Sequence, residues 1–303
     1  MLTNDTDTKG QTMNILVIGG TRFFGIHTVK RLLESGHTVT VATRGGHENP
    51  FAQNVRHLTV DKTDADSVRR TLGGQVFDAV IDKVAYASND VRSLLANIRC
   101  TRYIQMSSCA VYQSAHLLIT EDEFDARKHP LHWIDRPDDY AEGKRQAERA
   151  ALEFMQPDAC TFVRYPVVLG ANDYTNRLRF YTDHIRNGIP MHIEHPAAAV
   201  SYIHELEAGA FFAHLAEHPV SGAVNGCAKG ILSQQEILEC IAAISQKKAI
   251  LSDSGDPAPY DGNYADTSYN CTKAEHSGFA FSDVHTWITD LLKAEFSAKT
   301  GAP

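Results

Sequence analysis

Apolar and polar positions alternate in a regular order along the first half of the chain. Apolar runs of strand length lie at 14–18, 38–42, 57–60, 77–81, 103–106 and 161–165. Between several of these runs, apolar side chains recur at helical spacing in segments 24–34, 64–72, 89–98 and 139–154. Short buried strands that alternate with helices predict a parallel, doubly wound α/β sheet with right-handed crossovers.

The pattern loosens after about residue 170. Helical segments are predicted at 177–186, 204–217, 234–244 and 284–295, separated by loops that contain Pro and Gly. Ligands of open α/β sheets bind at the carboxyl ends of the strands. We therefore expect residues 171–303 to form a smaller, mostly helical substrate-binding region over the sheet domain of residues 13–170, with an interleaved boundary. The polar residues 1–12 are predicted to be a disordered N-terminal extension.

Composition places the chain among ordinary soluble proteins, with 43% hydrophobic and 22% charged residues in a length of 303. It contains no apolar stretch of the roughly 20 residues that a membrane-spanning helix needs, and its N-terminus lacks a secretory pattern. We therefore expect a cytoplasmic protein without a membrane partner. The net charge of −8 disfavours a nucleic-acid partner and favours a small-molecule substrate. A homodimer is compatible with the sequence but not required by it.

Cysteine and histidine positions do not indicate a metal site. The six cysteines show no C-x-x-C pair, so we expect reduced thiols. The pairs His129/His132 and His192/His195 have ligand-like spacing, but each lies among prolines and lacks an evident third ligand. We therefore predict no bound metal.

A glycine-rich turn follows the first predicted strand and reads GGTRFFG from residue 19 to residue 25. Gly19 permits a tight turn that brings backbone N–H groups close to a pyrophosphate, and the helix that follows stabilises the anion. Gly25 would let the helix pack tightly on the strand. A strand, a glycine turn and a helix in this order indicate dinucleotide binding on a Rossmann fold. The expected contacts come from Gly19, Thr21, Arg22, Phe23, Phe24 and Gly25.

The end of the second predicted strand indicates which dinucleotide is bound. Arg44 stands about 20 residues after the turn, where NAD-binding proteins carry an acidic residue. A guanidinium can bind a 2′-phosphate with two hydrogen bonds, so Arg44, with Arg22 as second contributor, indicates NADP(H), while NAD(H) stays open. Asp61 and Lys62 suit an adenine contact, although surface charge explains them equally well.

Three residues form a candidate proton-transfer set. Tyr140 and Lys144 lie four residues apart on a predicted helix, so both face the same side. A neighbouring ammonium lowers the pKa of a phenol from about 10 toward neutrality. Ser108 follows an apolar strand, where its hydroxyl can hydrogen-bond a substrate oxygen that gains charge. The alternative for this serine is a strand-end cap.

These motifs together resemble the extended and atypical short-chain dehydrogenases/reductases, which are NAD-dependent epimerase/dehydratase-like proteins. The resemblance runs from about Met13 to Glu295 and rests on segments 19–25, 107–112, 140–148 and 164–166. It implies that Ser108 polarises a carbonyl or alcohol, that Tyr140 transfers the proton, and that Lys144 binds the nicotinamide ribose and tunes Tyr140. Residues Tyr165, Pro166 and Val167 would line the nicotinamide pocket.

Departures from better-known branches of the family narrow the reaction. Cys109 and Ala110 stand where sugar-nucleotide dehydratases carry an Asp-Glu pair, and Pro166 and Val167 stand where epimerases commonly carry Phe-Asn. The sequence therefore favours an oxidoreductase that reduces a carbonyl, or oxidises the alcohol, of a small molecule. Two alternatives stay open: an epimerase or isomerase that retains its cofactor, and a non-catalytic dinucleotide sensor or RNA-binding relative. The GGTRF form of the turn resembles an atypical subgroup with some non-catalytic members.

Overall fold

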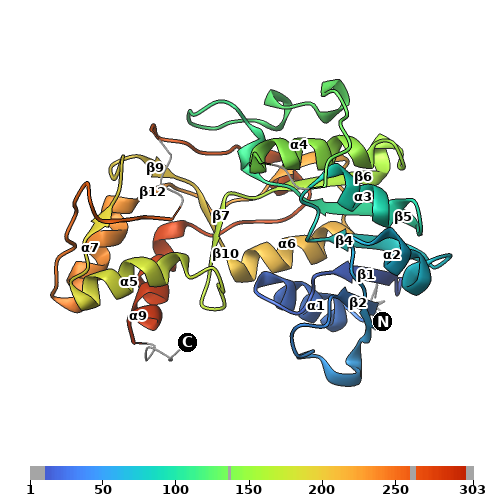
Figure 1. Ribbon diagram of the computed structural model, residues 1–303, viewed down its shortest axis with the longest axis horizontal. Helices are drawn as coiled ribbons and strands as arrows, with labels where there is room; N and C mark the ends of the chain where they lie inside the picture. Colours follow the sequence, from blue (N-terminus) through green and yellow to red (C-terminus); the bar gives the residue numbers. More distant parts are fainter. Residues whose placement is uncertain (1–10, 136–137, 260–263, 298–303) are drawn as a thin grey trace, which may run out of the picture.

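The computed structural model describes residues 11–135, 138–259 and 264–297, so most of the predicted N-terminal extension lies outside the described residues. A sheet of seven parallel strands forms the first lobe (Figure 1), in the order β11-β6-β5-β4-β1-β2-β3. Its strands are β1 (Asn14–Ile18), β2 (Thr38–Thr43), β3 (Arg56–Thr59), β4 (Val76–Asp82), β5 (Arg99–Met106), β6 (Cys160–Arg164) and β11 (Gly222–Asn225). The predicted α/β class with a Rossmann doubly wound sheet is confirmed.

Helices cover both faces of this sheet. Ile15 and Val17 of β1 pack in one apolar core with α1 (Phe24–Glu34) and α6 (Glu205–Glu217). Leu16 and Ile18 point the other way, into a second core with α2 (Ala65–Leu72), α3 (Ser88–Leu95) and α4 (Tyr140–Ala151). Successive strand residues face opposite sides, so a strand covered on both faces is apolar throughout, as the continuous runs in the sequence indicated.

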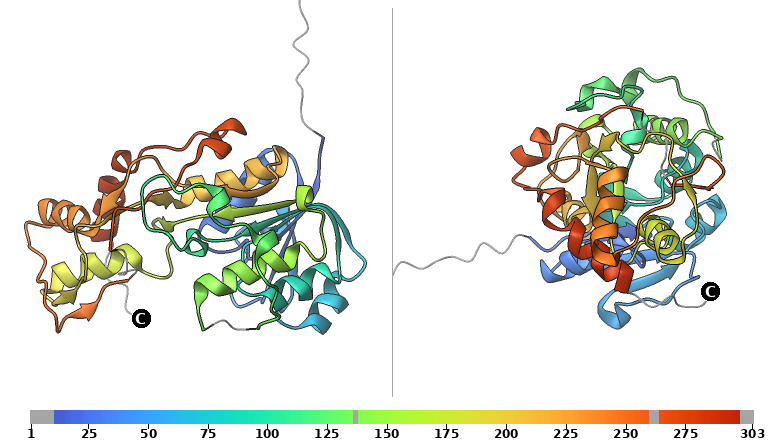
Figure 2. Two further views of the ribbon diagram at one scale, coloured as in Figure 1. Left: turned by 90° about the horizontal axis from the view of Figure 1, so that it is seen from above. Right: turned by 90° about the vertical axis from the view of Figure 1, so that its left-hand side faces the viewer.

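A second lobe stands beside the sheet in Figure 1 and in the left view of Figure 2. Its own apolar core lies among α5 (Arg177–Asn187), α7 (Gln234–Ser245) and α9 (Ile288–Ser297). Short strand pairs border it: β7 (Val167–Leu169) with β10 (Tyr202–His204), β8 (Met191–His192) with β13 (Asp256–Pro257), and β9 (Ala199–Val200) with β12 (Leu232–Ser233). The short helix α8 (Thr272–His276) follows. No described helix is long and apolar enough to cross a membrane.

The two halves of the chain interleave. β11 adds a seventh strand beside β6, and α6 packs on α1, although both elements come from the second half of the sequence. The sequence predicted α6 as a helix but did not predict β11, a strand of four residues without a long apolar run. The second half therefore contributes to both lobes, and the chain crosses between them near β7 and β10 (Figure 1).

Candidate functional site: a cleft at the carboxyl ends of the strands

A cleft of about 1250 Å³ opens between the lobes, at the carboxyl ends of β1, β2, β4 and β5. Pockets for drug-sized ligands measure about 300–1,000 Å³, so this cleft has room for a dinucleotide and a further small molecule. Most of the predicted site residues line it: Gly19, Thr21, Arg22, Phe23, Phe24, Arg44, Asp61, Lys62, Ser108, Tyr140, Tyr165, Pro166 and Val167. Gly25 and Lys144 are not among the lining residues.

The glycine-rich turn has the geometry expected of an anion site. Gly19 has a φ of +82°, which glycine adopts without steric cost, and its N–H donates to Ala42 O at 2.9 Å. Phe23 has a φ of 51° and a ψ of −141°, a conformation that costs a residue with a Cβ about 1–3 kcal/mol. α1 then begins at Phe24, with no acidic residue in its first turn to repel a phosphate. The turn therefore fits a pyrophosphate.

The side chain of Arg22 leaves the turn toward the second lobe. Its guanidinium carbon lies 3.6 Å from the centroid of the Tyr174 ring, and the Phe23 ring meets the same tyrosine edge-on at 6.3 Å. Tyr174 belongs to the loop between β7 and α5. Arg22 therefore points away from the turn, whereas its contribution to a 2′-phosphate pocket stays a prediction.

The expected adenosine end of the cleft contains Arg44, Asp61 and Lys62. Arg44 is exposed, and its charge helps to lower the pKa of Asp61, although hydrogen bonds from Thr63 contribute more. Lys62 is 6% exposed and forms an ion pair with the fully buried Asp82. Lys62 is therefore not a surface charge, which was the alternative to an adenine contact, because its ammonium points into the protein. An adenine contact by Asp61 or Lys62 stays a prediction.

The end of the cleft near β5 and α4 contains Ser108 and Tyr140, and Lys144 lies close to Tyr140. Ser108 follows β5 and accepts a hydrogen bond from Ala110 N at 3.1 Å, so it caps a short helical turn while its own O–H remains a donor. Tyr140 is the first residue of α4 and is 46% exposed. The Nζ of Lys144 lies 5.7 Å from the centroid of the Tyr140 ring, so the two side chains share one face of the helix as predicted.

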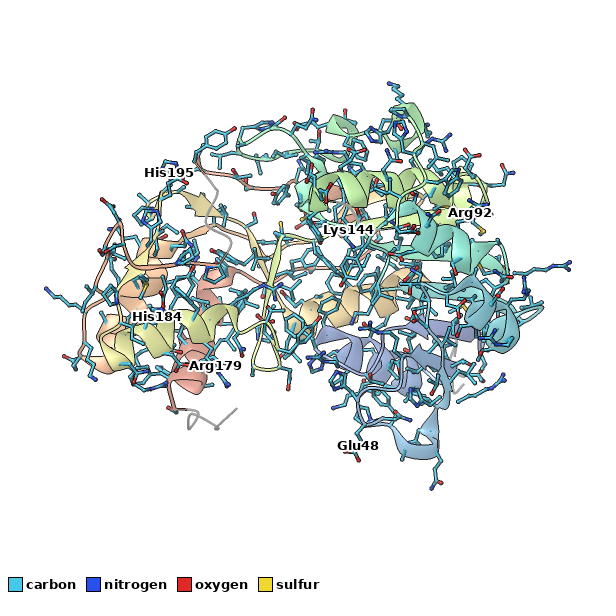
Figure 3. The ribbon with its side chains drawn as sticks, in the orientation of Figure 1. Glu48, Arg92, Lys144, Arg179, His184 and His195 are labelled. Carbon is cyan, nitrogen blue, oxygen red and sulfur yellow. The ribbon has the colours of Figure 1, made fainter. Side chains whose placement is uncertain are left out.

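Lys144 is fully buried beneath this end of the cleft and lies on the inner side of α4 (Figure 3). Its Nζ donates to Ala85 O at 2.7 Å and to Met106 O at 3.0 Å. Burial lowers the pKa of Lys144 to about 7, although the Asp82 carboxylate acts in the opposite direction. The ammonium therefore gains and loses its proton near neutral pH. Its contact with a nicotinamide ribose stays a prediction.

Tyr165, Pro166 and Val167 border the cleft between the lobes. The Tyr165 side chain is 3% exposed and donates to Ala208 O of α6 at 2.7 Å, so its hydroxyl is committed to the core. Burial raises the pKa of this phenol well above its ordinary value. Pro166 interrupts the strand, and β7 begins at Val167. These residues can offer apolar surface to a ligand, and their place in a nicotinamide pocket stays a prediction.

A buried ion pair holds the segment that follows Ser108. Arg164 binds Glu148 through Nε and Nη2 at 3.0 and 2.7 Å, and Ser107 donates to the same carboxylate. Arg164 also donates to the hydroxyl of Tyr112 at 3.1 Å. The motif residues Glu148 and Arg164 therefore support the site and do not face the cleft.

Sequence reasoning did not single out Tyr86 and Tyr174 of the cleft wall, and it considered Lys83 only as a charge at a strand end near the expected path of the cofactor. Tyr86 lies closer to the Lys144 ammonium than Tyr140 does, with 4.5 Å from Nζ to its ring centroid. Burial raises the pKa of Tyr86, so it keeps its proton more firmly than an ordinary tyrosine. Tyr86 and Tyr174 lie in loops, where hydrophobic periodicity carries no signal.

The two histidine pairs do not form ligand sets. His129 Nε2 lies 2.8 Å from Glu142 Oε1, which makes a local pair beside α4. Across residues 11–135, 138–259 and 264–297, no group of three or more His, Cys, Asp or Glu side chains is placed to hold a metal ion.

Two curated proteins are similar to parts of this chain. The chloroplast stem-loop binding protein of 41 kDa b of Arabidopsis thaliana is 25% identical over 203 residues, which cover 62% of this chain and 51% of that protein. The 2′-dehydrokanamycin reductase of Streptomyces kanamyceticus is 32% identical over 79 residues, 26% of this chain and 22% of that protein. The chain therefore matches about half the length of the first relative and less of the second.

Solved structures share the fold over nearly the whole chain. The UDP-glucose 4-epimerase of Thermus thermophilus, solved with NAD, has a TM-score of 0.70 and 18% identity, covering 94% of this chain and 100% of the epimerase. The UDP-glucuronic acid 4-epimerase of Bacillus cereus, also solved with NAD, has a TM-score of 0.68 and 16% identity over 94% and 96% of the two chains. The model of the NAD dependent epimerase/dehydratase family matches residues 15–194. This match spans more than half of the sequence and includes the turn, Ser108, Tyr140 and Lys144, and the chain belongs to the NAD-dependent epimerase/dehydratase family.

Proposed function

We propose that the chain is an NADP(H)-dependent oxidoreductase that reduces a carbonyl of a small molecule or oxidises the corresponding alcohol. The observation that carries this proposal is the placement of Ser108 and Tyr140 along one cleft, with the Lys144 ammonium 5.7 Å from the Tyr140 ring centroid. The turn at Gly19 lines the same cleft and is the pyrophosphate site that this proposal requires. Cofactor and substrate would therefore meet near Tyr140.

Each residue of the set has a distinct part in the proposed reaction. A bound nicotinamide cofactor would supply or accept the hydride. In the reducing direction, the Ser108 hydroxyl donates a hydrogen bond to the carbonyl oxygen and stabilises the charge that develops there. Tyr140 donates the proton that completes the alcohol. Lys144 in its charged form stabilises the phenolate that remains.

Replacing Tyr140 with phenylalanine tests the proposal. Tyr140→Phe keeps the ring and removes the titrating hydroxyl, so turnover should fall by about 10²–10⁴-fold while NADPH affinity barely changes. The assay follows NADPH oxidation with a substrate found by screening ketones and aldehydes. Tyr86→Phe is the matched variant, because it removes the other phenol beside Lys144. Wild-type turnover in Tyr140→Phe, or a larger loss in Tyr86→Phe, would contradict the role given to Tyr140.

An epimerase that retains its cofactor is the second candidate function, because the family includes epimerases by name. Such an enzyme uses its nicotinamide as an internal redox agent and does not exchange it. The measurement is the absorbance of cofactor that remains with the purified protein after gel filtration. Stoichiometric retained cofactor, without net NADPH oxidation by any carbonyl substrate, would favour the epimerase.

A nucleic-acid-binding role is the third candidate, and it rests on the name of the stem-loop binding relative. The net charge of −8 opposes it, because binding to a phosphate backbone depends on clustered cations. Gel-shift titration with a stem-loop RNA at about 0.15 M salt tests whether the chain binds RNA. Saturable binding, together with no turnover in a broad substrate screen, would replace the oxidoreductase proposal.

A further inference from the structure

Lys83 lies directly beneath the glycine-rich turn. It follows β4, is 7% exposed, and its side chain runs toward the start of α1. Its Nζ lies 3.2 Å from Gly19 O and 3.4 Å from Arg22 O, and 4.0 Å from the centroid of the Phe24 ring. One ammonium therefore holds both ends of the turn.

This ammonium is not neutralised by an acidic partner. The neighbouring Asp82 is engaged by Lys62 and by the Tyr103 hydroxyl, the latter at 2.7 Å. Among the residues that the structure describes, no carboxylate forms an ion pair with Lys83. Burial lowers the pKa of Lys83 to about 7. The protein thus keeps an amine without a carboxylate partner immediately behind its candidate phosphate site.

The contacts of Lys83 also orient the turn. In a trans peptide the C=O and the following N–H point in opposite directions. The Arg22 carbonyl points to the ammonium, so the N–H of Phe23 points away from it. The Gly19 carbonyl also points to the ammonium, so the N–H of Gly20 points away from it. Lys83 therefore supports a turn in which Phe23 holds a φ of 51°.

The position of Lys83 also explains why residue 25 is a glycine. A Cβ on Gly25 would collide with Lys83 Nζ and with Gly19 O. The sequence suggested that Gly25 allows close packing of helix on strand, and the closeness of the Gly19 and Gly20 backbone to position 25 agrees with this, while the same space also accommodates the ammonium. Gly25 and Lys83 form one unit with the turn.

We propose that Lys83 is the cation of the phosphate turn, and that it takes up a proton when the pyrophosphate of a dinucleotide binds. This inference rests on the dinucleotide binding in the proposed function. A nearby anion favours the charged form of an amine and raises its pKa. Between the pKa values of the free and bound states, the complex holds more protons than the free protein. Affinity should therefore fall by up to about tenfold per pH unit as pH rises through this window.

Other charged groups around Lys83 define the useful pH range. His27 on α1 interacts with Lys83 through its charge, and burial lowers the pKa of His27, with Glu205 acting in the opposite direction. His27 is therefore neutral above pH 7 and does not take part in the window. The remaining charged groups nearby are Arg22, Lys30, Glu205, Lys62 and Asp82. A dinucleotide without a 2′-phosphate avoids titration of the ligand itself, whose phosphate has a pKa near 6.

Proton uptake can be counted by calorimetry. NADPH and NADH are titrated into the full chain at pH 6 and pH 8, each in two buffers of different ionisation enthalpy. We expect close to one proton taken up per dinucleotide at pH 8, and close to none at pH 6. Lys83→Met, which keeps the length of the side chain, should lose the uptake and flatten the dependence of Kd on pH. Lys30→Met removes an exposed lysine of α1 and is the matched control, with uptake retained.

The outcomes separate this inference from the proposed function. Dinucleotide that binds without proton uptake at pH 8, or uptake that persists in Lys83→Met, overturns the role of Lys83 alone. Failure of both dinucleotides to bind the wild-type chain overturns the proposed function as well. If Lys83→Met does not fold, Lys83→Arg decides the point, because its permanent charge should give binding without uptake.

Discussion

Three lysine side chains around the cleft, Lys62, Lys83 and Lys144, are almost completely buried. Lys62 meets the carboxylate of Asp82, whereas the other two meet main-chain carbonyl oxygens. A carboxylate offsets the loss of hydration of an ammonium, and carbonyl dipoles do so only in part. This explains why burial brings the pKa of Lys83 and Lys144 down to about 7. The charge state of the cleft therefore changes near neutral pH.

The predicted preference for NADP(H) over NAD(H) depends on Arg44. It lines the cleft just after β2, and its side chain is exposed, so a 2′-phosphate can reach it. Arg44→Ala should weaken NADPH binding by about 10- to 100-fold and leave NADH binding nearly unchanged, because hydrogen bonds between charged groups contribute about 1.5–3 kcal/mol. Arg56→Ala, which removes an exposed arginine of β3, is the control. Calorimetric titration of both cofactors is the measurement, and equal wild-type affinities would contradict the assignment.

At the scale of elements, the phosphate turn joins β1 to α1 through two residues with positive φ, Gly19 and Phe23. Gly19→Val should abolish dinucleotide binding, because a branched side chain would block the approach of the pyrophosphate, and it strains the turn, since φ is +82° and the added Cβ would lie 3.0 Å from Val84 Cγ1. Strain of this kind costs about 1–3 kcal/mol, so the protein should still fold. Binding is measured by NADPH fluorescence and folding by thermal melting.

Gly36 provides a matched control for this substitution. It has the same φ of +82° and lies in the turn between α1 and β2, where an added Cβ would meet no heavy atom within 4 Å. Gly36→Val should therefore cost similar stability and keep dinucleotide binding. Binding retained in Gly19→Val would remove the turn from the cofactor site, and loss of cooperative melting would make Gly19 structural.

The sequence predicted these elements where local signals were strong. The bounds of β1 and α1 agree with the prediction, because a continuous apolar run, a glycine turn and helical periodicity follow one another. Tyr140 begins α4 because Asp139 caps the helix through Ala141 N. The short β11 could not be predicted, since its place depends on pairing with β6, far away in sequence. Lys83 was visible only as a charge at a strand end, and its burial depends on the turn above it.

At the scale of the whole molecule, the cleft exists because two apolar cores meet across β7 and β10. The sequence predicted a helical second region over the sheet, and it located the residues that line the cleft on the sheet side. It could not locate Tyr174, because the contact of this ring with Arg22 joins a loop of one lobe to the turn of the other. Contacts between lobes depend on tertiary geometry that periodicity does not encode.

The two lysines with low pKa values also predict how the stability of the whole molecule depends on pH. An unfolded lysine has a pKa of about 10.4, whereas Lys83 and Lys144 have values of about 7 in the folded chain. Above pH 7 the unfolded state therefore binds more protons than the folded state, and the free energy of unfolding should rise with pH. Each lysine adds about 1.4 kcal/mol per pH unit at most.

This dependence can be measured by urea unfolding between pH 7 and pH 7.5. The range avoids histidines with lowered pKa values, such as His27, His204 and His214, which titrate below it. It also stays below about pH 8.5, the ordinary pKa of a cysteine, because buried thiols and phenols that keep their protons in the folded state, such as Cys109 and Tyr103, give a slope of the opposite sign at higher pH. Lys144→Met should reduce the slope by about half, because one of the two titrating groups is lost, whereas Lys30→Met should leave it unchanged. A wild-type stability that is flat or falls across this range would show that Lys83 and Lys144 keep their protons in the folded protein, and with them a permanent positive charge beside the cleft.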